Sequence, residues 1–110
     1  MSLDVKCLGR LVRDPISRST ATDKQLTAFT FVTDAGSTNS DGKRNPLYLN
    51  VNAWGKNGEN IIKYCKKGTQ LLITGNVCEN STYTRKEDGQ PAASLTITLE
   101  KFEFVSPKRE

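Results

Sequence analysis

Hydrophobic and polar residues alternate along most of this chain with the two-residue period of β-strands. The period is clearest in LYLNVNAW, residues 47–54, whose even positions are Tyr48, Asn50, Asn52 and Trp54. Because successive side chains on a strand point to opposite faces, these residues form a row of two amides flanked by two aromatic rings. The odd positions form an apolar row that we expect in the core: Leu47, Leu49, Val51 and Ala53.

Four further segments have the composition of strands, with many β-branched and aromatic residues. Gly9 interrupts the first of them, which indicates a bulge or a close approach of another backbone. In the last, the hydrophobic positions change phase near Glu100, which predicts a bulge or bend there. The predicted strands are residues 4–12, 26–33, 69–78 and 94–105.

One segment has helical periodicity: NGENIIKYCKKG, residues 57–68. Ile61, Ile62 and Cys65 fall on one side of such a helix, and Gly68 stands where a left-handed C-cap is expected. The segments between the elements are polar and contain turn-forming residues. The predicted connections are residues 16–25, 34–46 and 79–91.

Five strands with one helix between the third and the fourth match the element order of the OB-fold. We therefore predict an all-β fold with one short helix, a five-stranded Greek-key barrel that forms a single domain over residues 1–110. A fold does not establish a function. It does direct attention to the face of the second and third strands, where such barrels bind oligonucleotides.

Composition excludes several kinds of chemistry. The chain has no histidine, so catalysis by an imidazole base is excluded, and three cysteines cannot complete a Cys/His zinc site. We expect no metal and no other cofactor. Cys7, Cys65 and Cys78 are widely spaced and odd in number, which indicates reduced thiols, and we expect them to be small buried hydrophobes.

The remaining composition concerns location and partners. The chain has neither a long apolar run nor the apolar core of a signal peptide, so we expect a cytoplasmic protein without membrane contact. Sixteen basic residues against twelve acidic ones give a formal charge of +4. A mild basic excess is compatible with a polyanionic partner but does not identify one.

The aromatic row of residues 47–54 has two interpretations. Unpaired bases have flat apolar faces, and each base that stacks on an aromatic ring contributes about 1–3 kcal/mol, so Tyr48 and Trp54 are candidates for base stacking. Alternatively, both rings belong to the core at one end of the barrel and keep only their polar atoms in water. Asn50 and Asn52 argue against the core, because buried amides need a partner for every hydrogen bond.

Candidate phosphate contacts surround these rings. Tyr83 is followed closely by Arg85 and Lys86, so a base could stack there while the cations hold adjoining phosphates. The alternative is a solvated hairpin with a scattered tyrosine. Other cations bracket the third strand and together predict a phosphate track, although each alone is a solvated charge: Lys43, Arg44 and Lys56, extended by Arg10, Arg13 and Arg18.

The chain resembles the bacterial single-stranded DNA-binding protein family, which includes phage and plasmid members, from about Val5 to Val105. An aromatic-Gly-Lys run, a short helix ending in Lys-Lys-Gly, a strand and a Tyr-Thr turn are specific in combination. The resemblance is carried by LGRLVRDPISR (8–18), AFTFVTD (28–34), VNAWGKNGENIIKYCKKG (51–68), LLITGNV (71–77) and YTRKEDGQ (83–90).

The resemblance implies residue roles and an assembly. Tyr48, Trp54 and Tyr83 occupy positions where the family places base-stacking aromatics. Members often carry a further tryptophan after strand two, whereas residues 35–47 here contain no aromatic before Tyr48, and Lys43 and Arg44 are candidates to hold the backbone instead. Members commonly form homotetramers built from dimers, so we expect residues 4–12 in an interface.

The resemblance also implies a function. We expect a nucleoid-associated protein that binds single-stranded DNA with little sequence preference and protects it during DNA replication, recombination and repair. Members usually continue into a flexible acidic tail that recruits replication proteins, whereas this sequence stops at SPKRE, so either the tail lies outside these residues or this member lacks it.

Two alternatives remain open at this point. One is an OB-fold interaction module, a replication accessory protein whose aromatic face binds a protein partner or RNA. The other is a small hydrolase or nuclease, for which Asp34 and Asp41 would supply carboxylates. Both lie in a turn-rich segment where capping or solvation is the usual role, so we expect no enzymatic activity.

Overall fold

The computed structural model describes residues 2–19, 24–34, 38, 40–84, 86, 89 and 91–105, and for residues 81, 83 and 91–93 the backbone alone. Its helix is not long and apolar enough to cross a membrane. The elements in chain order are β1 (Asp4–Leu11), β2 (Ile16–Ser19), β3 (Gln25–Thr33), β4 (Leu47–Trp54), α1 (Gly55–Tyr64), β5 (Gln70–Thr84) and β6 (Pro91–Phe104).

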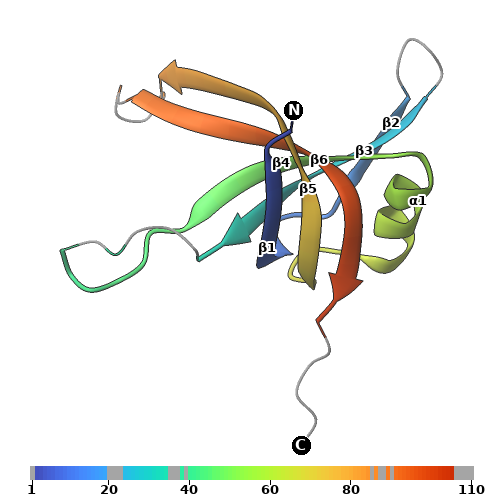
Figure 1. Ribbon diagram of the computed structural model, residues 1–110, viewed down its shortest axis with the longest axis horizontal. Helices are drawn as coiled ribbons and strands as arrows, with labels where there is room; N and C mark the ends of the chain where they lie inside the picture. The colour runs from blue at the N-terminus through green and yellow to red at the C-terminus, as the bar shows by residue number, and fades with distance from the viewer. Residues whose placement is uncertain are drawn as a thin grey trace, which may run out of the picture.

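The strands form one sheet that closes into a barrel (Figure 1). Their order is β1-β5-β6-β4-β3-β2, and a further pairing of β1 with β3 joins the two sides. β4 and β6 run parallel, whereas the other pairs are antiparallel. The five long strands, with α1 between β4 and β5, have the predicted arrangement, so the OB-fold prediction is confirmed. The barrel also carries a sixth, short strand, β2.

Alternation along the strands decides what is buried. Phe29 and Phe31 of β3 meet edge to face with ring centroids 6.3 Å apart, and both are buried in the core. The prediction that Leu47 joins the core is wrong, because this residue lies 45% exposed at the first pair of the β3–β4 ladder, opposite Thr33. The other core residues include Leu11, Leu49, Val51, Ala53, Ile61, Leu71, Ile73, Ile97 and Leu99.

Two glycines allow backbones to approach closely inside the barrel. A Cβ added at Gly9 would collide with the carbonyl oxygen of Val32, and one added at Gly75 would collide with that of Thr98. The sequence-based expectation of a close approach at Gly9 is therefore confirmed. The missing side chains let β1 pack closely against β3, and β5 against β6, where a larger residue would push the strands apart.

The β5–β6 ladder changes register twice. Thr74 pairs with Lys101 but Gly75 pairs with Leu99, so Glu100 is an extra residue on β6 and the predicted bulge is confirmed. Further along, Val77 pairs with Ile97 but the next pair joins Glu79 to Thr96. Cys78 is therefore an extra residue on β5. It is exposed, so the prediction that all three cysteines are buried is wrong.

The helix is shorter than predicted at its carboxyl end. α1 begins at Gly55 and ends at Tyr64, with extended residues at both caps, whereas residues 57–68 were expected to be helical. Gly68 does have a positive φ of 91°, but it lies in the turn towards β5, where its N–H donates to the carbonyl of Leu11 at 2.9 Å. Ile61 and Cys65 face the core, while Ile62 is 42% exposed.

Two segments predicted as connections contain strand. Ile16–Ser19 form β2 against β3, and the hairpin of β5 and β6 extends to Thr84 and Pro91. In β2 all four residues are exposed. The end of the long hairpin pairs with no other described strand and extends from the barrel in Figure 1. Because β2 has no buried face, it does not need the hydrophobic alternation on which the strand predictions depended.

The approach at Gly75 predicts a stability defect. We expect Gly75→Ala to lower the free energy of unfolding by about 1–3 kcal/mol, because the new methyl group meets a backbone carbonyl that cannot rotate away. Gly42→Asn is the control, since Gly42 has a φ of 82° and open space around it, and asparagine tolerates that backbone conformation. Denaturant unfolding measures both variants. If Gly75→Ala had the same free energy of unfolding as the unchanged protein, the β5–β6 ladder would be able to widen at Gly75 without cost.

Candidate nucleic-acid interface

The even residues of β4 lie on the outer surface of the barrel. Tyr48 is 57% exposed and Trp54 is 41% exposed. Asn50 is also exposed and Asn52 is half-buried. The interpretation that placed both rings in the core is therefore wrong, and the amides lie between two accessible rings on one face.

Pairing across the sheet extends this face to either side of β4, because residues directly opposite each other point to the same side. Asn50 lies between Thr30 of β3 and Thr96 of β6. Asn52 lies between Ala28 of β3 and Thr98 of β6. The middle of the face is thus built from amides, hydroxyls and small side chains.

The rings stand at the two ends of the same face. Trp54 is paired with Leu26, which is in turn paired with Arg18 of β2. Tyr48 is paired with Val32, which is in turn paired with Arg10 of β1. Each aromatic residue therefore shares its row with an arginine two strands away.

A groove of about 400 Å³ crosses the middle of this face. Its floor includes Thr30, Asn50 and Asn52, and Thr96 lies beside them. The groove crosses the strands from β2 on one side to β5 on the other. The further residues that line it are Arg13, Asp14, Ile16, Arg18, Ala28, Phe29, Val51 and Glu79.

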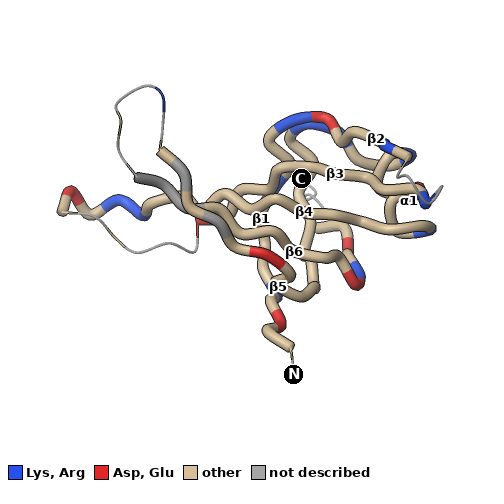
Figure 2. Tube along the Cα trace, turned by 90° about the horizontal axis from the view of Figure 1, so that it is seen from above, with Lys and Arg blue, Asp and Glu red and all other residues tan. Residues whose placement is uncertain are grey.

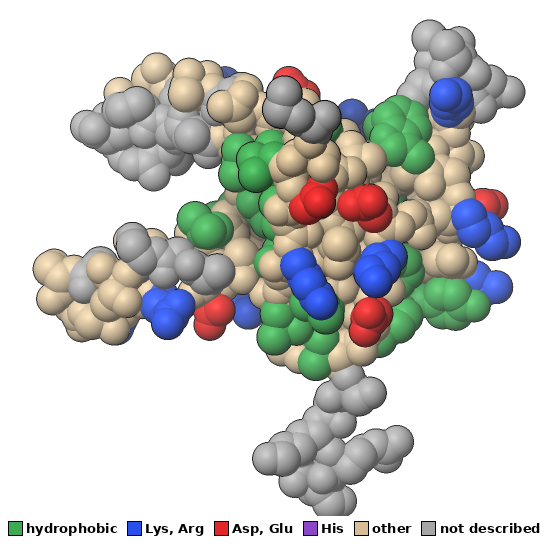
Figure 3. Space-filling view, in the orientation of Figure 1, with side chains coloured by type: hydrophobic (Ala, Val, Ile, Leu, Met, Phe, Trp, Pro, Cys, Tyr) green, Lys and Arg blue, Asp and Glu red, His purple; other side chains and the backbone are tan. Residues whose placement is uncertain are grey.

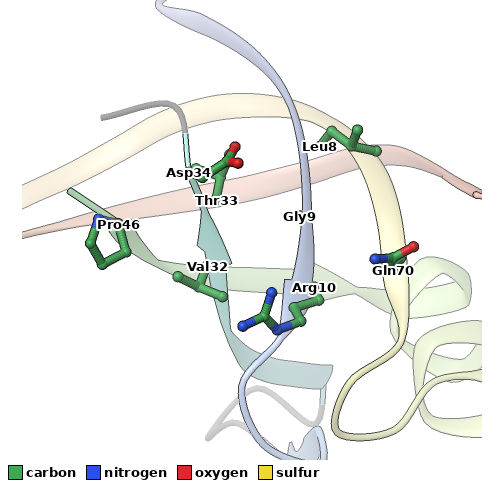
Figure 4. A pocket seen from close by; sticks show the side chains of 8 residues that line it. All are labelled: Leu8, Gly9, Arg10, Val32, Thr33, Asp34, Pro46 and Gln70. Atoms are coloured by element: carbon green, nitrogen blue, oxygen red, sulfur yellow. The ribbon is translucent and has the colours of Figure 1, made fainter. Parts of the chain in front are cut away.

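Arg10 lies between two smaller hollows at the other end of the face. One, of about 220 Å³, is lined by Arg10 together with Tyr48 and Lys67. The other, of about 250 Å³, lies between β1 and the end of β3, and Figure 4 shows the residues that line it. In this view the Arg10 side chain is turned towards Val32, while the Asp34 carboxylate lies at the opposite end of the hollow.

The other predicted cations lie around this face. Lys56 is exposed in the first turn of α1, two residues after Trp54. Lys43 and Arg44 are exposed in the segment before β4, where Arg44 forms an isolated bridge with Thr38. Figure 2 shows basic positions on this segment, which extends away from the barrel, and further ones near β2 and α1.

The long hairpin carries the remaining candidates. Lys86 is exposed beyond the end of β5, and the backbone of Tyr83 pairs with Ala92. The side chain of Tyr83 and the whole of Arg85 lie outside the described residues. The structure therefore brings Arg10 and the four polar and aromatic residues of β4 onto one surface, and places Lys43, Arg44 and Lys86 on projecting segments.

Several residues of this face were absent from the predicted site. Thr30 and Thr96 could have been found, because each has the opposite phase to buried neighbours on its strand. Ile16 belongs to β2, whose polar sequence gave no strand signal. Glu79 reaches the face only because of the irregularity at Cys78, which alternation alone does not show.

Acidic and basic side chains are mixed on the barrel surface drawn in Figure 3, and burial affects two of the cysteine thiols. On the face drawn in Figure 3, acidic and basic side chains lie next to one another over the barrel, and they do not gather into one basic patch. Burial raises the pKa of the Cys7 and Cys65 thiols, which keeps both protonated and unreactive near neutral pH.

Comparison with known proteins places the chain in a family. Residues 4–105 match the single-strand binding protein family. The chain is 31% identical over 101 residues to single-stranded DNA-binding protein 1 of Staphylococcus aureus, covering 92% of this chain and 64% of that protein. It is 30% identical over 104 residues to single-stranded DNA-binding protein 2 of Listeria monocytogenes, covering 94% of this chain and 64% of that protein.

A solved structure shows the same fold. The crystal structure of a small single-stranded DNA-binding protein from Streptomyces coelicolor superposes with a TM-score of 0.75 at 16% identity, covering 94% of each chain. The chain spans less than two thirds of the length of the curated relatives described above. The match over residues 4–105 nevertheless covers nearly the whole of the sequence, and the chain belongs to the single-strand binding protein family.

Proposed function

We propose that this domain binds single-stranded DNA, with stacking on Tyr48 and Trp54 as the main contact with the bases. The observation that carries the proposal is the exposure of both rings on one outer face, 57% and 41%, with two amides between them. An exposed aromatic ring leaves apolar surface in water, which a stacked base would cover. The names of the relatives support the same ligand.

The geometry suits a strand of unpaired nucleotides. Six residues separate Tyr48 from Trp54, which corresponds to roughly 20 Å along a β-strand. One nucleic-acid strand that follows β4 would contact both rings and cross the groove between them. Stacking would contribute about 1–3 kcal/mol per base and does not depend on which base is present. Asn50 and Asn52 each offer a donor and an acceptor to base edges.

Cations around the face would hold the phosphates. Arg10 shares a row with Tyr48, Arg18 shares a row with Trp54, and Lys56 follows Trp54 in α1. Lys43 and Arg44 would extend the track on the segment before β4 and Lys86 on the long hairpin, while the contacts of Tyr83 and Arg85 rest on the sequence. Each neutralised phosphate releases counterions, so binding would weaken with salt.

The biological role follows from this ligand. We infer that the domain covers single-stranded DNA without acting on it as an enzyme, and so protects it during DNA replication, recombination and repair. Such a role would place the protein in the cytoplasm at the nucleoid, and replication proteins would be its partners there. The alternative of an interaction module for a protein or RNA would require the same face to prefer that partner over unpaired DNA.

We further infer that the domain assembles through β1, as a homotetramer built from dimers. β1 pairs with β3 only at Arg10 and Leu11, so residues 4–9 have one backbone edge without a partner among the described strands. Such an edge is a template for pairing with a second chain. On the outer face of β1, Leu8 is 56% exposed and lies opposite Leu72 of β5.

The stacking proposal predicts a specific loss on removing one ring. We expect Tyr48→Leu to weaken binding of oligo-dT by about 1–3 kcal/mol while leaving the unfolding temperature unchanged, because the ring is on the surface. Titration followed by the fluorescence of Trp54 measures the affinity.

Tyr64→Leu is the matched control, since Tyr64 is also 57% exposed but lies at the end of α1. We expect it to bind oligo-dT as tightly as the unchanged protein. Equal weakening in both variants would contradict stacking at Tyr48, and a preference for a hairpin RNA over oligo-dT would favour the interaction module.

The phosphate contacts predict a change in salt dependence. For the single strand, log affinity falls by about 0.7 per neutralised phosphate for each unit of log salt. We expect Lys56→Gln to reduce this slope by about 0.7, because one phosphate contact is removed. Lys101→Gln, an exposed change on the outer side of β6 where it pairs with β5, should leave the slope unchanged. Equal slopes for Lys56→Gln and the unchanged protein would exclude Lys56 from the track.

The assembly proposal predicts that a charge on β1 separates the subunits. We expect Leu8→Glu to lower the assembled mass measured by sedimentation, because two carboxylates would face each other across a symmetric interface. Ile62→Glu on α1 introduces the same charge at a residue 42% exposed and should leave the mass unchanged. An unchanged mass for Leu8→Glu would exclude β1 from the interface.

A further inference from the structure

The irregularity at Cys78 determines which side chain of β5 reaches the groove. Up to Val77, the even residues of β5 lie outside and the odd ones inside the barrel. If the strand continued regularly, Cys78 would face outward and Glu79 inward. Because Cys78 is an extra residue, Glu79 pairs with Thr96 and takes the outer position instead. Bulges next to binding sites commonly redirect a side chain in this way.

Glu79 thereby completes a row of four side chains, one from each of four neighbouring strands. Glu79 is paired with Thr96, Thr96 with Asn50, and Asn50 with Thr30. All four line the same groove. Glu79 is exposed, so its carboxylate remains accessible to a ligand in that groove.

The two arginines of the groove and Glu79 lie on opposite sides of it. Arg13 and Arg18 line it on the side of β2 together with Asp14, whose carboxylate accepts a hydrogen bond from the backbone N–H of Lys67 at 2.8 Å, whereas Glu79 lines it on the side of β5. Glu79 has no ion-pair partner among the described residues. A nucleic-acid strand that crosses this groove would therefore find two arginines for its phosphates on the side of β2, and on the side of β5 the carboxylate of Glu79.

A carboxylate accepts hydrogen bonds and repels other acceptors. Towards DNA it disfavours phosphates and carbonyl oxygens, and it favours an amino group such as N4 of cytosine, the usual partner of Glu or Asp at a base edge. Thymine and uracil present O4 at the same place. The amide of Asn50 can bind either kind of base edge, so the discrimination falls to Glu79.

We propose that Glu79 makes this site prefer cytosine over thymine or uracil at the nucleotide bound beside Asn50. The inference rests on the proposed binding of single-stranded DNA to this face. Stacking elsewhere remains indifferent to sequence, so the preference concerns one position among those that the domain covers.

Competition between oligo-dC and oligo-dU tests the inference. At position 4 cytosine carries an amino group and uracil a carbonyl oxygen, which is the difference that Glu79 would read. Uracil is used in place of thymine because it lacks the methyl group, which could make contacts of its own. Oligomers of about 16 nucleotides reach the upper end of the site size of one OB-fold. The affinities are measured at fixed low salt for the unchanged protein, for Glu79→Gln and for Glu103→Gln. Glu103 is the matched control, an exposed carboxylate on the same hairpin that is paired with Leu72.

We expect the unchanged protein to bind oligo-dC more tightly than oligo-dU. Glu79→Gln should lower the ratio of the oligo-dC affinity to the oligo-dU affinity by about fivefold, which is the lower end of the discrimination by a good side chain–base pair. The reason is that the glutamine amide can accept a hydrogen bond from cytosine and donate one to uracil. Glu103→Gln should keep the ratio. Both variants should unfold at the temperature of the unchanged protein, since both residues are exposed.

The outcomes separate this inference from the function on which it rests. Binding of both oligomers with the same ratio in the unchanged protein and in Glu79→Gln would overturn the cytosine preference and leave the binding of single-stranded DNA intact. An equal fall of the ratio in Glu103→Gln would also overturn it, because the effect would then be one of total charge. Failure to bind either oligomer would overturn the proposed function and this inference together.

Discussion

Closure of the barrel is the constraint on which the rest of the structure depends. Once β1 pairs with β3 as well as β5, the strand segments that form the barrel have one side chain row inside and one outside. Val51 is fully buried for the same reason that Asn50 is exposed, because the two are neighbours on one strand. The aromatic residues of β4 have the phase of the amides, so closure of the core leaves them on the surface. The candidate binding face is thus produced by the same alternation that produces the core.

Irregular positions adjust this regular frame. Gly9 and Gly75 remove side chains where strands come closest, which allows the barrel to be narrow. The extra residues Cys78 and Glu100 bend the long hairpin and change the phase of its strands. If β5 continued without an extra residue after Val77, Glu79 would have the inward phase and would not line the groove. The irregularity at Cys78 therefore determines which side chain of β5 the groove receives.

Prediction from the sequence succeeded where burial imposes a pattern. The core rows of β3 and β4, the phase change at Glu100 and the exposed face of Tyr48 follow from alternation, because a one-residue shift would exchange core and surface. Prediction failed for exposed segments, where burial imposes no pattern of hydrophobic residues. β2 has no buried residue, and Leu47 lies at the barrel rim, so composition carried no information about either. The end of α1 depends on Cys65 packing into the core in an extended conformation, which local propensity does not encode.

A carboxylate beside a nucleic-acid groove is compatible with tight binding because its effect is short-ranged. At physiological salt the Debye length is about 8 Å, so an exposed charge such as Glu79 acts strongly only on groups that it touches or nearly touches. The formal charge of +4 still favours a polyanion at longer range. Stacking on Tyr48 and Trp54 would then set most of the affinity without regard to sequence. Glu79 would act on one nucleotide only. There an amino group of the base can replace the water that is hydrogen-bonded to the carboxylate, whereas a carbonyl oxygen cannot donate a hydrogen bond to it.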